Sequence, residues 1–313
     1  MNVIITGASG FIGKALIEQL LKQKINITSI SRKQNKYLDK RIKQITSNFS
    51  DFSELSEKNF NNIDCVIYLA AINNFKKSEI QNPQDDFYRV NCDSAINLAL
   101  LSAKFNVKRF IYMSSIKADP KLNPELNSNE NIDYYAYTKF KAEKGLLDLP
   151  NKNQMIITII RSPLVYGPGV NNNFRSLIKL VKTRLPIPLG SVNNKRSFIA
   201  IENLVNFIIL CMRTEKFSGA SNQIFSVSDN EDVSTSELLR KISKAYGIRL
   251  FLVPFPLRWL RFLSKIFHKT KLIDSLVNSS IVDMSQLKSF IQWKPKISMD
   301  EQLRKIAKFD ERK

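Results

Sequence analysis

Three glycines separate a short apolar run from an amphipathic run at the start of the chain. The β-branched run at residues 3–5 predicts a buried strand, and the apolar spacing over residues 16–21 predicts a helix with one buried face. Gly7, Gly10 and Gly13 lie at the turn between them. Glycine there permits a positive φ and a close approach of the backbone to a ligand. The helix start also offers free N–H groups and the positive end of its dipole, so the turn predicts a phosphate site.

Strand-like and helix-like segments alternate after this turn. The runs "DCVIYLAA", "KRFIYMSS" and "QMIITIIRSPLVYG" predict buried strands, and "YRVNCDSAINLALLSAK" and "YAYTKFKAEKGLLDL" predict helices. This alternation indicates an α/β fold with a Rossmann-type doubly wound parallel sheet. We expect a dinucleotide-binding domain over residues 1–167 and a smaller C-terminal substrate-binding lobe over 168–313, partly interleaved with the sheet. Ser234 and Glu237 have capping-box spacing and predict a helix start in that lobe.

The charge of the chain is strongly positive but dispersed. The 313 residues include 48 Lys and Arg against 28 Asp and Glu, a net charge of +20. Such a field attracts anions, including nucleotide sugars, anionic lipid and nucleic acid. Because the basic residues are scattered, the pattern favours a solvated surface over a specific nucleic-acid partner.

Cysteine and histidine content excludes several kinds of site. Cys65, Cys92 and Cys211 are far apart and odd in number, which indicates a reducing compartment and a cytoplasmic protein. His268 is the single histidine, so neither a His-based metal site nor a Ser-His-Asp triad is expected. No apolar run reaches the ~20 residues of a membrane helix.

The basic amphipathic segment over residues 256–269 has two interpretations. It could lie on a membrane surface. The favoured alternative is an ordinary surface helix that packs onto the lobe through Trp259, Leu260, Leu263 and Phe267.

A tyrosine and a lysine four residues apart predict proton-transfer chemistry. Tyr135 and Lys139 would share one helix face, where an ammonium stabilises phenolate and lowers the tyrosine pKa. Such a tyrosine can act as a general acid or base near neutral pH. With a nicotinamide cofactor to move hydride, this pair would interconvert an alcohol and a ketone. The alternative is an ordinary surface helix.

The motifs "TGASGFIG", "YLAA", "FIYMSS", Tyr135-x-x-x-Lys139 and "RSPLVYGPG" occur in an order that resembles the extended short-chain dehydrogenase/reductase superfamily. Its members are nucleotide-sugar epimerases, dehydratases and reductases, including the NAD-dependent epimerase/dehydratase type. The resemblance implies that Ser115, rather than Ser114, is the catalytic serine and that Tyr135 is the acid/base. It further implies that Lys139 also holds the nicotinamide ribose. The residues expected to cradle the pyrophosphate are Gly7, Gly10, Phe11, Ile12 and Gly13.

Cofactor choice depends on the end of the second strand, where many NAD-using relatives carry an acidic residue. This chain has Ser31, Arg32 and Lys33, which favours NADP(H) because two cations could bind a 2′-phosphate. NAD(H) stays open if Arg32 stacks on adenine instead. The other expected cofactor contacts are Asn48, Phe49, Leu69, Ala70 and Ala71.

The resemblance also extends to the segments that bind the diphosphate of UDP-sugars. Asn173 and Arg196 match best. A second arginine expected shortly before Asp283 is not evident, so Lys269 or Lys271 would replace it or the substrate is held differently.

These features favour reduction of a UDP-4-keto-6-deoxy-N-acetylhexosamine at C4 for surface polysaccharide biosynthesis. The alternative enzyme is a UDP-sugar 4-epimerase with tightly bound NAD. A dehydratase is disfavoured because Ile116-Lys117 follows Ser115 where an Asp-Glu pair is usual. A non-catalytic cofactor sensor or an RNA-binding protein is the alternative of another class. By resemblance, the helices at 86–104 and 135–148 would pair two subunits in a homodimer.

Overall fold

The structure, a computed structural model, divides the chain into two units. It describes residues 1–49, 52–73, 83–127, 133–149, 155–213, 222–266 and 268–312. The first unit consists of Met1–Ser162 and Val205–Ser226, and the second of Pro163–Leu204 and Val227–Lys313. Each unit is therefore assembled from two separate stretches of the chain.

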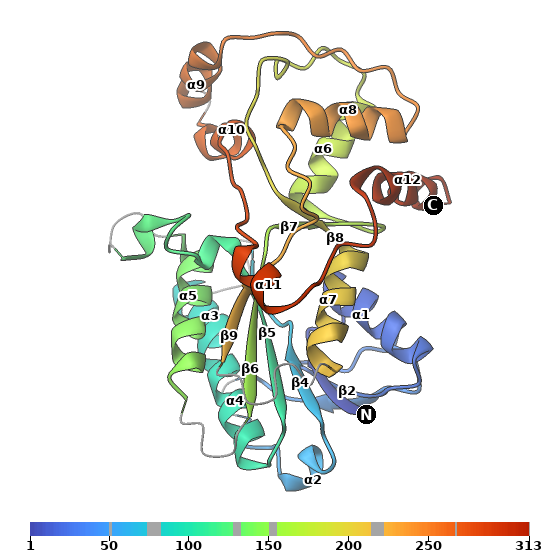
Figure 1. The fold of residues 1–313 in the computed structure, drawn as a ribbon, viewed down its shortest axis with the longest axis vertical. Helices are drawn as coiled ribbons and strands as arrows, with labels where there is room; N and C mark the ends of the chain where they lie inside the picture. Colours follow the sequence, from blue (N-terminus) through green and yellow to red (C-terminus); the bar gives the residue numbers. More distant parts are fainter. Residues whose placement is uncertain are drawn as a thin grey trace. The chain divides into compact units, whose positions relative to one another are not determined.

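A seven-stranded sheet, parallel throughout, forms the centre of the first unit (Figure 1). Its order in space is β3-β2-β1-β4-β5-β6-β9. The chain order reverses between β1 and β4, so their carboxyl ends form the switch point where open α/β sheets bind ligands. The predicted Rossmann-type sheet is confirmed. Its strands are β1 (Asn2–Thr6), β2 (Asn26–Ser31), β3 (Lys43–Thr46), β4 (Cys65–Tyr68), β5 (Arg109–Ser115), β6 (Ile156–Ser162) and β9 (Gln223–Ser226).

Helices cover both faces of this sheet: α1 and α7 lie on one face, and α3, α4 and α5 on the other (Figure 1). Apolar side chains of α4 and α5, among them Leu98 and Leu146, pack with Val66 and Phe110 of the strands in one core cluster. This packing fixes α5 against β5. The helical elements of the first unit are α1 (Phe11–Lys22), α2 (Glu57–Phe60), α3 (Pro83–Tyr88), η1 (Arg89–Asp93), α4 (Ser94–Lys104), η2 (Ile116–Ala118), η3 (Pro124–Asn127), α5 (Tyr134–Leu147) and most of α7 (Ile201–Arg213).

The helix predicted over residues 88–104 contains a π-helical turn, η1. A π-turn widens the helix and releases carbonyl groups from the ordinary ladder. The Tyr68 hydroxyl donates to the Val90 carbonyl and the Tyr112 hydroxyl to the Asn91 carbonyl, both at 2.6 Å. These tyrosines come from adjacent strands, β4 and β5. The sequence pattern predicted the helix but not the turn, because the partners that stabilise it are distant in the chain.

The second unit combines a two-stranded parallel sheet, β7 (Leu164–Tyr166) with β8 (Phe198–Ala200), and several helices. The predicted capping box is confirmed: the Glu237 N–H donates to the Ser234 hydroxyl, and the Ser234 N–H donates to the Glu237 carboxylate. The helices are α6 (Asn172–Lys182), α8 (Thr235–Ala245), α9 (Leu257–Ile266), α10 (Thr270–Val277), α11 (Ser285–Phe290) and α12 (Met299–Glu311).

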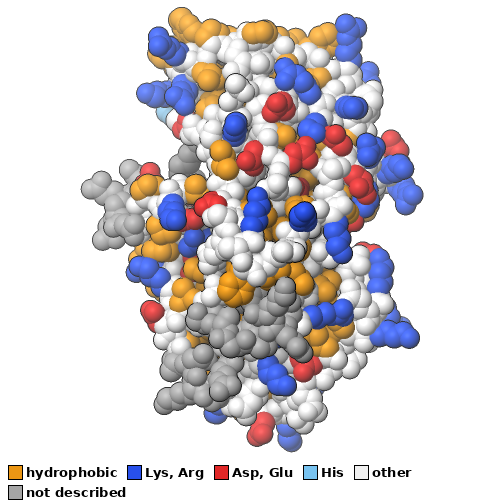
Figure 2. Space-filling model, in the orientation of Figure 1, with side chains coloured by type: hydrophobic (Ala, Val, Ile, Leu, Met, Phe, Trp, Pro, Cys, Tyr) orange, Lys and Arg blue, Asp and Glu red, His pale blue; other side chains and the backbone are white. Residues whose placement is uncertain are grey.

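Lysine and arginine side chains are scattered over the face drawn in Figure 2, as the dispersed charge predicts. The three cysteines are buried free thiols. Within the described ranges, no cluster of His, Cys, Asp and Glu is placed to hold a metal ion. None of the helices that the structure describes combines the length and the apolar character needed to cross a membrane.

The close packing of the turn between β1 and α1 leads to a prediction about the stability of the protein. A Cβ at Gly13 would lie 2.3 Å from the Gly7 carbonyl oxygen, so Gly13→Ala forces the turn to open. We expect a loss of about 1–3 kcal/mol, the usual cost of overpacking, measured by chemical denaturation. Gly10→Ala is the matched control, because its Cβ would lie 3.2 Å from the same oxygen and needs a smaller adjustment. Equal stability of the two variants would contradict the argument.

Candidate active site

The turn between β1 and α1 brings backbone segments into close contact. Gly7 has φ +71°, and a Cβ there would lie 2.8 Å from the Ala70 nitrogen at the end of β4. The Thr6 hydroxyl accepts from the N–H groups of Leu69 and Ala70, each at 3.1 Å. The carboxyl ends of β1 and β4 are therefore joined beside the glycine turn, which is where a dinucleotide would lie.

The first turn of α1 suits a phosphate group. Its N-cap, Gly10, makes no side-chain capping bond, and the first turn holds no acidic residue. Gly13 is buried, while Phe11 and Ile12 are half-buried. Unpaired N–H groups at the positive end of a helix favour an anion. The residues present therefore fit the diphosphate of a dinucleotide cofactor.

The predicted adenosine contacts lie at the ends of β2, β3 and β4. The Ser31 hydroxyl donates to the Lys33 carbonyl at 2.8 Å, and Arg32 is exposed. Asn48 and Ala71 are exposed, whereas Leu69 and Ala70 are half-buried.

Phe49 differs from the other predicted cofactor contacts. Its ring is buried, with 4% of the residue exposed, and packs 5.3 Å from the Phe52 ring, centroid to centroid. Its φ is +63°, and its carbonyl accepts from the Ser94 hydroxyl. The ring is a core side chain, so any contact of this residue with a cofactor would be made by its backbone, and the contact stays a prediction.

Ser115 and Tyr135 lie together at the end of β5 and the start of α5. The Tyr135 N–H donates to the Asp133 carboxylate at 3.1 Å, which caps the helix and fixes where it begins. Burial raises the pKa of Tyr135 to about 12, and a side-chain hydrogen bond with Ser115 opposes this rise. The Ser115 hydroxyl also accepts from the Lys117 N–H at 3.2 Å. The phenol is therefore a neutral acid near pH 7, with a serine hydroxyl beside it.

Lys139 lies one turn further along α5 and is 1% exposed. Its ammonium donates to the Met113 carbonyl at 2.8 Å and lies 4.4 Å from the centroid of the Tyr112 ring. Burial lowers its pKa to about 7, against the opposing charge of Glu143. The expectation that this ammonium lowers the Tyr135 pKa does not hold here. Desolvation of the phenol dominates, and the lysine donates to a backbone carbonyl.

A buried ion-pair network beside Lys139 was not predicted from the sequence. Arg161 of β6 binds Glu143 of α5 at 2.6 Å and Asp119 at 3.0 Å. The Ser114 hydroxyl donates to the same Glu143 carboxylate. Ser114 is 3% exposed, so its hydroxyl is committed to Glu143, while Ser115 keeps its place beside Tyr135. This arrangement favours Ser115 as the serine that meets a substrate. No local spacing indicates this network, because Arg161, Glu143 and Asp119 are distant from one another in the chain.

Asn91 is a second residue that sequence reasoning missed. Its side-chain nitrogen donates to the Ile72 carbonyl at 2.9 Å and to the Thr138 hydroxyl at 3.2 Å. Its side-chain oxygen accepts from the Ile72 N–H at 2.8 Å. The amide therefore links the segment after β4 to α5, in the turn that carries Tyr135 and Lys139.

The two predicted substrate residues belong to the second unit. Asn173 is exposed in the first turn of α6. Arg196 donates from its guanidinium to the Ser275 carbonyl of α10 and lies over the Phe198 ring, 5.5 Å from its centroid. Burial lowers the pKa of Arg196.

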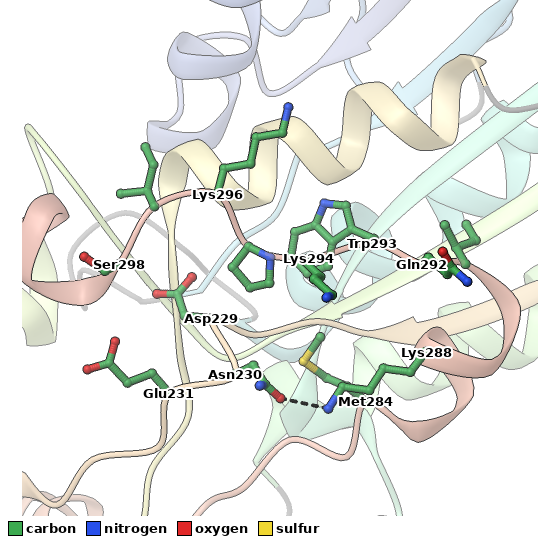
Figure 3. Close-up of a pocket in the computed structure, with 13 residues that line it drawn as sticks. Asp229, Asn230, Glu231, Met284, Lys288, Gln292, Trp293, Lys294, Lys296 and Ser298 are labelled. Atoms are coloured by element: carbon green, nitrogen blue, oxygen red, sulfur yellow. Dashed lines mark hydrogen bonds between the residues drawn. The ribbon is translucent and has the colours of Figure 1, made fainter.

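A cavity of about 950 Å³ within the second unit is lined by residues 229–231, by Met284 and Lys288 at α11, and by residues 291–298 between α11 and α12. Figure 3 shows Lys288 bonded to Asn230 on its rim and Trp293 on its wall. Asp229 at its edge accepts from the Tyr166 hydroxyl at 2.7 Å and from the Asn203 amide. That carboxylate is thus engaged within the unit. None of the predicted site residues lines the cavity.

Comparisons with known proteins agree with this geometry. The family described as "NAD dependent epimerase/dehydratase family" matches residues 3–228. A "UDP-glucose 4-epimerase" of Vibrio cholerae is 34% identical over 98% of this chain and 94% of its own length. An "N-acetyl-alpha-D-glucosaminyl-diphospho-ditrans,octacis-undecaprenol 4-epimerase" of Escherichia coli O157:H7 is 26% identical over 88% of this chain and 83% of its own.

Among solved structures, the UDP-glucuronic acid 4-epimerase of Bacillus cereus in complex with NAD shares the fold. Its TM-score is 0.74 at 19% identity, over 100% of this chain and 99% of that one. With the parallel sheet, the glycine turn and the matched residues 3–228, the chain belongs to the NAD-dependent epimerase/dehydratase family of extended short-chain dehydrogenases/reductases.

Proposed function

We propose that the protein is an NAD-dependent 4-epimerase of a sugar linked through a diphosphate. The observation that carries the proposal is the pairing of Tyr135 with Ser115 at the carboxyl end of β5. β5 is the direct neighbour of β4, and β4 of β1, whose ends hold the glycine turn. Dinucleotide site and proton-transfer group thus lie along one edge of one sheet.

The roles of the residues follow from their surroundings. A bound nicotinamide would supply the hydride chemistry at C4 of the sugar. Tyr135 would accept the proton of the C4 hydroxyl as the phenolate during oxidation, and the phenol so formed would return it during reduction. Ser115 would hold the same oxygen through its hydroxyl. Lys139 would donate to the cofactor ribose, while burial of the Tyr135 phenol opposes formation of the phenolate.

Epimerisation is favoured over reduction by the relatives. The Vibrio cholerae protein, matched over nearly its whole length, is named a 4-epimerase, and the Bacillus cereus structure holds NAD. Epimerisation uses the cofactor reversibly, so it needs no external reductant.

Reduction of a 4-keto sugar by NADPH is the second candidate. It rests on the end of β2, where Ser31, Arg32 and Lys33 include no carboxylate that would repel a 2′-phosphate. Net reduction oxidises NADPH, and the oxidised cofactor must leave before the next turnover. Epimerisation regenerates the bound NAD in each cycle, so the enzyme can retain it. Cofactor retention on purification therefore separates the two candidates.

The substrate class is a sugar diphosphate ester. The name of the Vibrio cholerae relative contains a UDP-sugar, and the name of the Escherichia coli O157:H7 relative contains a sugar diphosphate on a polyprenol. Asn173 and Arg196 are the proposed diphosphate contacts. A homodimer through α4 and α5, a cytoplasmic location and a place in surface polysaccharide biosynthesis stay predictions.

The test of the proposal is a direct assay of the purified protein. We expect UDP-glucose, UDP-galactose or their N-acetylated forms to be converted to the C4 epimer without added reductant, as followed by chromatography of the sugars. Bound NAD should be released on denaturation in near-equal amount to the protein. Oxidation of added NADPH by a UDP-4-keto sugar, with no epimerisation, would favour the second candidate.

Tyr135→Phe should retain the fold and the cofactor but lose at least about a hundredfold in kcat, because it removes the proton-transfer group. Tyr134→Phe is the matched control: Tyr134 is the neighbouring phenol on α5, and it is 40% exposed. Turnover should be near normal in the control. Comparable turnover in the two variants would remove Tyr135 from the mechanism.

Arg32→Ala should separate the two cofactors. If Arg32 binds a 2′-phosphate, the Kd of NADPH rises about tenfold, the scale of a charged hydrogen bond, and that of NADH changes little. Arg41→Ala, which removes another exposed arginine after β2 that is already paired with Asp39, is the control. Titration of intrinsic fluorescence measures both constants. Equal effects on NADPH and NADH rule out the 2′-phosphate contact.

A further inference from the structure

Helix α9 turns an apolar face outward. Trp259, Phe262 and Ile266 are 58%, 54% and 55% exposed, and their i, i+3, i+7 spacing places them on one side of the helix. The opposite side is buried through Leu260 and Ser264, at 7% and 4%. This pattern reverses the usual amphipathic arrangement, in which the apolar stripe faces the core.

The favoured sequence interpretation of this segment is therefore wrong for Trp259, which does not pack onto the unit. It is correct for Leu260, which is buried. Phe267 and the side chain of Leu263 lie outside the described residues.

Two of the exposed apolar groups form a pair, and another lies on the neighbouring helix. The rings of Trp259 and Phe262 pack edge to face with centroids 6.1 Å apart. Helix α10 packs against α9, and its Leu272 is 56% exposed. Solvent-exposed aromatic pairs that support each other form a preformed ridge, which loses little side-chain entropy when it is covered.

Cations flank the apolar face. Arg258, Arg261, Lys265 and Lys269 are exposed, and residues 257–273 contain no acidic residue. Among the described residues, no salt bridge involves any of the four, although Arg261 donates to the Asn278 side chain at 3.2 Å. Figure 2 shows blue and orange side chains side by side where Figure 1 places α9. We call this surface the α9–α10 ridge: Trp259, Phe262, Ile266 and Leu272 with Arg258, Arg261, Lys265 and Lys269.

We propose that the α9–α10 ridge docks the protein on the surface of an anionic lipid bilayer. An interfacial helix carries exposed aromatic and aliphatic residues to enter the headgroup region and cations to bind lipid phosphates. Tryptophan is favoured at that depth because its ring is apolar and its N–H is polar. Helix α9 has 10 residues, so it lies on a bilayer and does not cross it.

The positive charge of the ridge disfavours a second copy of this chain, or another protein, as its partner. In a two-fold contact between copies of this chain, the same cations would face one another and repel. Protein interfaces in general are depleted in lysine at their centres. An anionic lipid surface neutralises every cation of the ridge at once, and each lysine or arginine near it adds to the affinity.

The test is co-sedimentation of the full chain with vesicles. We expect binding to vesicles that contain about a third phosphatidylglycerol, and at least tenfold weaker binding to phosphatidylcholine vesicles. Binding should weaken as salt rises, because counterions screen the attraction. Absence of binding to the anionic vesicles would overturn the proposal.

Two variants locate the contact. The triple variant Arg258→Gln, Arg261→Gln, Lys265→Gln should lower the affinity for anionic vesicles at least tenfold. The double variant Trp259→Ser, Phe262→Ser should do the same by removing apolar insertion. All five residues are exposed, so we expect the circular dichroism and melting of both variants to match the parent.

Matched controls separate the ridge from the overall charge of +20. The control triple Lys40→Gln, Lys43→Gln, Lys108→Gln removes the same charge from exposed positions in the first unit. Tyr37→Ser removes an aromatic ring that is 99% exposed. Neither should change vesicle binding by more than twofold. Equal losses in the control triple and the ridge triple would show that the whole field, not the ridge, binds lipid.

Tryptophan fluorescence gives an independent readout. Trp293 is 7% exposed, so a blue shift on adding anionic vesicles should come from Trp259. Trp259→Phe should keep most of the binding but abolish the shift. A shift that persists in this variant would contradict insertion of α9. A change from dimer to monomer in the Trp259→Ser, Phe262→Ser variant without lipid, with vesicle binding unchanged, would assign the ridge to a contact between copies.

Discussion

The contact between the Gly13 position and the Gly7 carbonyl is the constraint on which the first unit depends. With 2.3 Å between a would-be Cβ and that oxygen, only glycine lets α1 start so close to the end of β1. Next to this turn, the Thr6 hydroxyl accepts from the backbone after β4, so the ends of two neighbouring strands are joined. A diphosphate needs such an edge, because backbone N–H groups can meet it only where no side chain intervenes.

Burial, more than charge pairing, sets the electrostatics around α5. The inward face of this helix carries a lysine, a glutamate and a tyrosine within three turns. Arg161 forms ion pairs with both Glu143 and Asp119. The Lys139 ammonium donates to the Met113 carbonyl and not to Glu143. Burial raises the pKa of the Glu143 carboxyl and lowers that of Lys139, whose ammonium has a carbonyl and an aromatic ring but no carboxylate as direct partners.

The spacing of residues in the sequence predicted the features that depend on interactions between residues close together in the chain. The strands, the glycine turn, the capping box at Ser234 and the shared face of Tyr135 and Lys139 all follow from residues close together in the chain. The π-turn at Arg89–Asp93, the core position of Phe49 and the Arg161–Glu143 pair depend on partners from other strands and helices. The exposure of Trp259 is a further case, since hydrophobic spacing identifies a helix face but not the side on which the rest of the unit lies.

The poised state of Lys139 couples ligand binding to the proton concentration of the solvent. With a folded-state pKa near 7, a fraction of the molecules carries a neutral amine at physiological pH. A ligand that accepts a hydrogen bond from the ammonium stabilises the charged form and so draws a proton from the buffer as it binds. Its affinity then declines as the solution becomes alkaline, and its apparent binding enthalpy varies with the ionisation heat of the buffer chosen.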